Sequence, residues 1–83
     1  MTTIGILLFD GAEELDIVGP WEVFTASSAL LERAGETPDK AVLVGPTLDP
    51  VQCRKGMRLL PDVTRAAFAP LDVLVVPGGD GVM

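Results

Sequence analysis

The sequence contains no histidine and only one cysteine among its 83 residues. A catalytic triad that needs histidine, or a metal site held by histidine, would have to take those residues from elsewhere. One cysteine cannot form an internal disulfide bond, which is compatible with the reducing cytoplasm, so we expect a cytoplasmic protein. We predict no metal site and no cofactor for this segment.

Basic residues and long apolar runs are also scarce. Six Lys and Arg stand against twelve Asp and Glu, and the formal net charge is −6. This charge argues against nucleic acid or an anionic membrane as a partner, because both attract basic surfaces. The sequence has no apolar run of about 18 residues that could span a membrane. Its start, Met-Thr-Thr-Ile-Gly-Ile, lacks the basic residues of a secretory signal.

The remaining composition, 48% hydrophobic and 22% charged, is typical of a globular domain. The nearly continuous apolar run at residues 71–76 predicts a strand buried on both faces, as in a parallel sheet. Shorter runs at 4–9 and 41–44 predict two more strands, and the turn-rich stretch 50–60 predicts a small antiparallel hairpin. With a helix after the first strand, this order predicts an α/β fold with a doubly wound parallel sheet.

The region after the first predicted strand has the pattern of an amphipathic helix. Apolar side chains recur at helical spacing at Ile17, Trp21, Phe24 and Leu31. Two starts are possible: Pro20, because proline suits the first turn, or a residue near Glu13, with a kink at Gly19-Pro20. Gly35 is expected to end this helix. Residues 64–68 predict a second, short helix.

The turn Pro77-Gly78-Gly79 follows the last predicted strand. In open α/β sheets, ligand and catalytic sites form at the carboxyl ends of the strands. A βα unit needs a helix after such a turn, and only two residues follow Gly81. We therefore expect residues 1–83 to be the amino-terminal part of a single α/β domain, completed by a carboxyl-terminal half.

Four motifs, taken in order, resemble the ThiJ/PfpI superfamily of class I glutamine-amidotransferase-like proteins. They are Leu8-Phe9-Asp10-Gly11, Glu14-Leu15-Asp16-Ile17-Val18-Gly19-Pro20, Gly56-Met57-Arg58-Leu59-Leu60-Pro61-Asp62 and Asp72-Val73-Leu74-Val75-Val76-Pro77-Gly78-Gly79. The second and third look most like the isonitrile hydratase branch, while residues 49–53 are similar to the parkinsonism-linked deglycase branch. The resemblance implies a flavodoxin-like sandwich, of which this chain holds the amino-terminal half, and a homodimer.

The resemblance also implies a cysteine-dependent hydro-lyase or hydrolase acting on a small molecule. Isonitrile hydration to an N-substituted formamide is the first expectation. The alternatives are the ligand-sensing domain of a transcription regulator and a deglycase or stress-response protein of the same fold. The family's nucleophilic cysteine follows the Pro-Gly-Gly turn at some distance, so the sequence does not contain it.

Asp16 is the expected catalytic acid, because it matches the family's acidic residue that reaches the nucleophilic cysteine. A carboxyl buried beside a thiolate is pushed toward its neutral form and can then pass a proton to substrate. The alternative is that Glu13, Glu14 and Asp16 only favour a helix start through the helix dipole.

Gly78 and Gly79 are the second expected site residues, since glycine lets backbone N–H groups approach an oxyanion. The alternative is a plain turn. Cys53 lies in the predicted hairpin with no histidine to activate it, so we expect a small hydrophobic or dimer-contact residue. Trp21 and Phe24 are expected to anchor the core of the domain rather than stack on a ligand.

Overall fold

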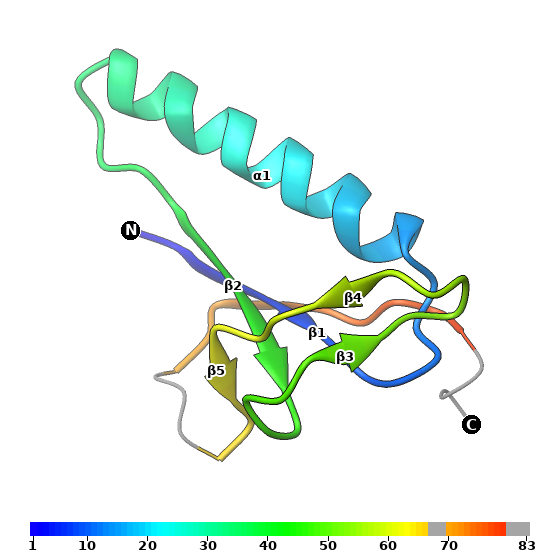
Figure 1. Cartoon of the computed structure of the whole chain (residues 1–83). Coiled ribbons are helices and arrows are strands. Elements are labelled where there is room, and N and C mark those ends of the chain that lie inside the picture. Colours follow the sequence, from blue (N-terminus) through cyan, green and yellow to red (C-terminus); the bar gives the residue numbers. More distant parts are fainter. Residues whose placement is uncertain (67–69, 80–83) are drawn as a thin grey trace.

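The computed structural model describes residues 1–66 and 70–79 of the chain (Figure 1). One long helix and six strands occur in this part. In chain order they are β1 (Thr3–Leu7), α1 (Leu15–Arg33), β2 (Lys40–Gly45), β3 (Val51–Gln52), β4 (Arg58–Leu59), β5 (Val63–Thr64) and β6 (Val73–Val75).

Four of the strands form a parallel sheet in the order β5-β2-β1-β6. β1 is central, and its Ile6 is in register with Leu43 of β2 and Val75 of β6. Helix α1 connects β1 to β2 and lies along one face of the sheet (Figure 1). The remaining strands, β3 and β4, form the predicted antiparallel hairpin. The α/β class and the parallel sheet are therefore as predicted.

The helix begins at Leu15, near the earlier of the two starts, and Pro20 lies inside it. Proline has no N–H, so the Asp16 carbonyl lacks the usual helical donor four residues on. The first turn is held by the Asp16 N–H, which donates to the Glu13 carbonyl at 3.1 Å. Gly35 follows the helix in a left-handed conformation, with φ of 78°, as expected for the residue that ends it.

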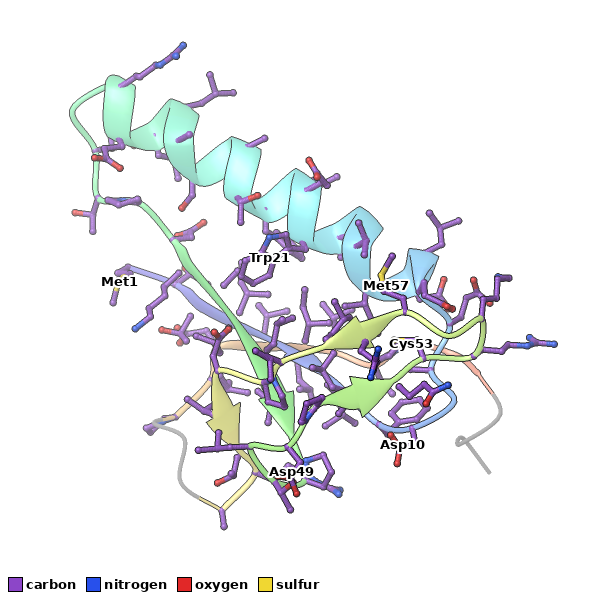
Figure 2. The ribbon with its side chains drawn as sticks, in the orientation of Figure 1. Met1, Asp10, Trp21, Asp49, Cys53 and Met57 are labelled. Atoms are coloured by element: carbon purple, nitrogen blue, oxygen red, sulfur yellow. The ribbon has the colours of Figure 1, made fainter. Side chains whose placement is uncertain are left out.

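The hydrophobic core lies between α1, the hairpin and one face of the sheet. Its buried residues are Ile6, Leu8, Ala12, Ile17, Val51 and Cys53. Trp21 packs against this cluster beneath the helix, as predicted (Figure 2), and Phe24 is half-buried. Burial of these apolar groups is the main favourable term for docking the helix.

The predicted short helix at 64–68 is wrong at its start. Thr64 belongs to β5, which pairs with β2 through Val44↔Val63 and Gly45↔Thr64. The β-branched side chains of Val63 and Thr64 suit an extended strand better than a helix. Residues 67 and 68 lie outside the described residues.

β6 is shorter and more exposed than predicted. Among the described residues it pairs only with β1, and Val73, Leu74 and Val76 are 43%, 53% and 57% exposed. Burial on both faces is therefore not reached within the described ranges, because nothing there covers its outer side. On the sheet face away from α1, an apolar cavity of about 420 Å³ is lined by Leu7, Val44, Arg65, Leu71 and Leu74.

No helix in residues 1–66 and 70–79 is long and apolar enough to cross a membrane.

Candidate functional site

The candidate site lies where the strand order reverses. β2 flanks β1 on one side and β6 flanks it on the other. Ligands of open α/β sheets bind outside the carboxyl ends of strands at such a reversal. The segments that follow β1 and β6 meet there: Ala12 forms an antiparallel bridge with Gly79, and the Glu13 N–H donates to the Gly78 carbonyl at 2.8 Å.

Two of the predicted site residues, Asp16 and Gly78, are in direct contact. The Gly78 N–H donates to Asp16 Oδ2 at 3.0 Å, which joins the first turn of α1 to the loop after β6. A substrate oxyanion at this position would compete with the carboxylate for that donor. Asp16 is exposed among the described residues, so the burial that its predicted role requires has to come from another segment.

Gly79, the third predicted site residue, lies at a close backbone crossing. Its φ is 137°, a conformation that residues with a side chain rarely adopt. A Cβ placed there would lie 2.3 Å from the Gly11 carbonyl oxygen and 2.7 Å from Ala12 Cα. The structure therefore requires glycine at this position for steric reasons alone.

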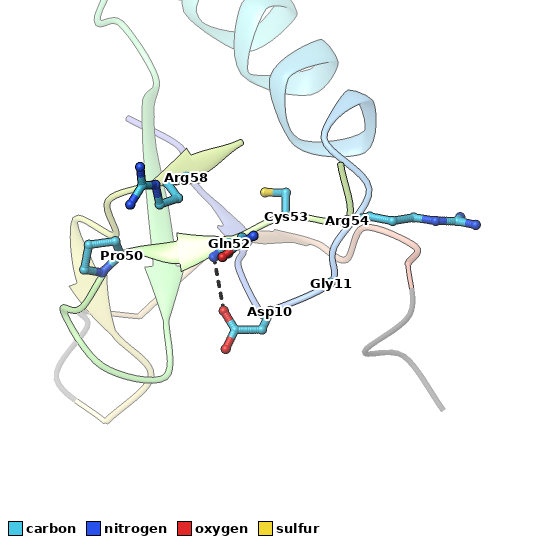
Figure 3. A pocket seen from close by; sticks show the side chains of 7 residues that line it. All are labelled: Asp10, Gly11, Pro50, Gln52, Cys53, Arg54 and Arg58. Carbon is cyan, nitrogen blue, oxygen red and sulfur yellow. Dashed lines mark hydrogen bonds between the residues drawn. The ribbon is translucent and has the colours of Figure 1, made fainter. Parts of the chain in front are cut away.

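The β3-β4 hairpin is hydrogen-bonded to the other edge of the segment between β1 and α1. The Gly11 N–H donates to the Gln52 carbonyl at 2.9 Å, and the Arg54 N–H donates to the Ala12 carbonyl at 2.8 Å. Asp10 Oδ1 accepts the Gln52 N–H at 3.1 Å (Figure 3). The residues between β1 and α1 are thus hydrogen-bonded to the hairpin on one edge and to the loop after β6 on the other.

Glu14 makes a contact that the sequence did not reveal. Its Oε2 accepts the N–H groups of Lys55 at 2.7 Å and Met57 at 3.4 Å. Its Oε1 is buried, and no hydrogen-bond donor among the described residues reaches it. The partners are 41 and 43 residues away in the chain, so local patterns could not show the contact.

Glu13 points to the same turn. Its Oε1 lies 2.5 Å from Lys55 Nζ, and this hydrogen bond lowers the pKa of Glu13. Because the Lys55 side chain is 67% exposed, water screens the pair. The three acids at the predicted helix start therefore have different partners. Glu13 and Glu14 bond to the hairpin turn, and Asp16 bonds to Gly78.

Cys53 is buried in the hydrophobic cluster, at 3% exposure. Burial raises the pKa of its thiol, and the charges of Glu14, Asp10 and Glu13 raise it further. An open hollow of about 610 Å³ beside it is lined by Asp10, Gly11, Pro50, Gln52, Cys53, Arg54 and Arg58 (Figure 3). Asp16, Gly78 and Gly79 do not line this hollow. Cys53 thus packs as a small hydrophobic residue, as the sequence predicted.

We predict that Cys53→Ser leaves the turnover of an intact protein largely unchanged. A protonated, buried thiol is a poor nucleophile, so iodoacetamide should modify Cys53 at least about tenfold more slowly in the native than in the unfolded protein. Steady-state kinetics and mass spectrometry measure the two effects. A loss of several orders of magnitude in turnover, with folding intact, would place the nucleophile at Cys53 and contradict the prediction.

No group of three or more Cys, Asp and Glu side chains within the described ranges could hold a metal ion. What the geometry does define is a parallel α/β protein with a carboxylate and a glycine loop meeting at the strand-order reversal. The model of the DJ-1/PfpI family matches residues 2–82, and the chain belongs to this family.

Among its relatives, isonitrile hydratase from Pseudomonas putida is 39% identical over 80 residues, which cover 95% of this chain and 31% of that protein. Drosophila melanogaster DJ-1beta superposes with a TM-score of 0.63 at 30% identity, over 96% of this chain and 39% of that one. An AraC family transcriptional regulator from Pseudomonas putida shares the fold, with a TM-score of 0.77 at 19% identity, over 100% of this chain and 50% of that one.

The chain therefore spans about a third of the length of the isonitrile hydratase and half that of the regulator. Its fold matches part of the DJ-1 fold of its structural neighbours, such as 39% of the DJ-1beta chain.

Proposed function

We propose that this segment supplies the acid and part of the backbone binding site of a cysteine-dependent enzyme, with isonitrile hydration as its reaction. The observation that carries the proposal is the contact of Asp16 with Gly78 at the strand-order reversal, 3.0 Å from N–H to carboxylate. The 39% identity to an isonitrile hydratase favours this substrate class over others.

In this reaction, a cysteine thiolate from the rest of the domain attacks the isonitrile carbon and forms a carbon–sulfur bond. Asp16 delivers a proton to that carbon, which gives a thioimidate. Water then adds to the same carbon, the thiol leaves, and an N-substituted formamide remains. The Gly78-Gly79 backbone helps to hold the reacting group in place.

The test is an assay of the whole protein, meaning this segment joined to the rest of its domain. Incubation with an aliphatic isonitrile should yield the corresponding formamide, measured by liquid chromatography and mass spectrometry, well above a protein-free blank. Folded protein that forms no formamide would contradict the proposal.

A second candidate is a ligand-sensing domain of a transcription regulator. Its support is the fold shared with the AraC family regulator over the whole of this chain. In that case the whole protein binds a small molecule without turnover and carries a basic helix-turn-helix module. The third candidate is a deglycase or stress-response protein. Its support is the similarity of residues 49–53 to the deglycase branch of the family.

We also propose that this segment contacts the carboxyl-terminal half of its own domain and a second copy of the protein. The single cysteine is compatible with the cytoplasmic location that we propose. A carboxyl-terminal half of the domain covers β6, whose Leu74 and Val76 are more than half exposed. A second copy of the protein pairs with the first, supported by the exposed apolar side chains of Leu15, Val23 and Leu30 on α1. Sedimentation velocity of the whole protein distinguishes a dimer from a monomer.

A further inference from the structure

We propose that Glu14 is a positioning residue, which fixes the start of α1 against the hairpin turn so that Asp16 faces Gly78. The inference rests on the proposed function to the extent that Asp16 is taken as the acid. It adds a role for a carboxylate that does not itself touch the reacting atoms.

The first step is the set of bonds between the turn and the helix start. The Arg54 N–H donates to the Ala12 carbonyl, and the Lys55 side chain forms a salt bridge with Glu13. The N–H groups of Lys55 and Met57 donate to the Glu14 carboxylate. Of these, only the Glu14 side chain reaches two backbone N–H groups of the turn. Bonds from N–H groups to a charged acceptor are stronger than neutral ones.

The second step leads from these bonds to the site. The Asp16 N–H donates to the Glu13 carbonyl at 3.1 Å, and the Val18 N–H donates to the Glu14 carbonyl at 2.9 Å. The backbone carbonyls of Glu13 and Glu14 therefore accept the first hydrogen bonds of the helix that carries Asp16. Because the Glu13 N–H also bonds to the Gly78 carbonyl, a displacement of this backbone alters the Asp16–Gly78 contact at both ends.

The third step concerns the buried Oε1 of Glu14. An acceptor without a partner is costly to bury, so its presence needs an explanation. Glutamine would keep one acceptor for the turn, but it would lack the negative charge that strengthens the hydrogen bonds from the Lys55 and Met57 N–H groups. We infer that the charge of Glu14, and not its shape alone, holds the turn.

The experiment compares Glu14→Ala and Glu14→Gln in the whole protein, with Glu22→Ala as a matched control elsewhere on α1. Misplacing an acid by a fraction of an ångström lowers kcat and leaves substrate binding nearly intact. We expect Glu14→Ala to lower kcat at least about tenfold with KM changed less than about threefold, and Glu14→Gln to have an intermediate effect. Glu22→Ala should leave both constants unchanged.

Amide hydrogen exchange supplies a second readout that does not depend on activity. Exchange should quicken in Glu14→Ala at Lys55 and Met57, and also at Gly78, which Glu14 does not touch. Faster exchange at Lys55 with unchanged exchange at Gly78 would overturn the inference, because the turn would then not be coupled to the site. If Glu14→Ala does not fold, the same comparison is made on Glu14→Gln.

The two proposals fail in distinguishable ways. If Asp16→Asn reduces turnover and both Glu14 variants keep wild-type kcat, the positioning role is overturned and the proposed function stands. If Asp16→Asn also keeps wild-type turnover, the proposed role of Asp16 is wrong. In that case the exchange at Gly78 alone decides whether Glu14 fixes the helix start.

Discussion

Replacement of Asp16 by asparagine is expected to lower the turnover of the whole protein by about a hundredfold or more, the scale of losing general acid–base catalysis. Asparagine keeps the size of the side chain and an oxygen that can accept the Gly78 N–H. In the native protein, the Gly78 nitrogen lies 3.0 Å from Asp16 Oδ2. It cannot deliver a proton. Stability should therefore change little, and turnover per folded molecule should fall.

The alternative, in which Asp16 only supports the helix start, predicts the reverse. Stability would fall by about 0.3–1 kcal/mol, because the neutral side chain loses its favourable interaction with the helix dipole, and turnover per folded molecule would stay constant. Chemical denaturation and steady-state kinetics on the same variant separate the two, with Glu22→Gln as the control for loss of a negative charge on α1. A stability loss with intact turnover would refute the catalytic role.

The elements that the sequence predicted well are those fixed by local patterns. The apolar runs at 4–9 and 41–44 mark β1 and β2, because parallel strands in the middle of a sheet need no polar alternation. The run at 71–76 marks β6, although this strand is shorter and more exposed than its apolar pattern predicts. The hairpin around Gly56 was equally clear. Thr64 was misassigned, since a two-residue strand is defined by its pairing with β2 and not by any periodicity.

The site was only partly predictable for a related reason. The family motifs predict Asp16 and Gly78 as site residues, but their contact across 62 residues of sequence depends on the parallel topology. For Glu14, the sequence predicts only a helix-start acid. Its hydrogen bonds to Lys55 and Met57 depend on where the hairpin packs against α1, which no pattern near residue 14 records.

Replacement of Gly79 by alanine is expected to destabilise the protein by about 3 kcal/mol or more, because steric overlap adds to backbone strain. The new Cβ would lie 2.3 Å from the Gly11 carbonyl oxygen, 2.7 Å from Ala12 Cα and 2.8 Å from the Glu13 nitrogen. All three are backbone atoms, so no side chain can rotate away. The loop after β6 would have to move from the segment after β1, and the Asp16–Gly78 contact would be lost with it.

Gly56→Ala is the matched control, because it separates strain from overlap. Gly56 also has a positive φ, of 98°, but no atom of the described residues lies within 4 Å of the Cβ that alanine would add. It should cost only the conformational penalty, about 1–3 kcal/mol. Urea denaturation of both variants of the whole protein measures the difference. If Gly79→Ala costs no more than Gly56→Ala, the backbones of the two segments do not cross this closely at the site, and the steric requirement for glycine at position 79 is wrong.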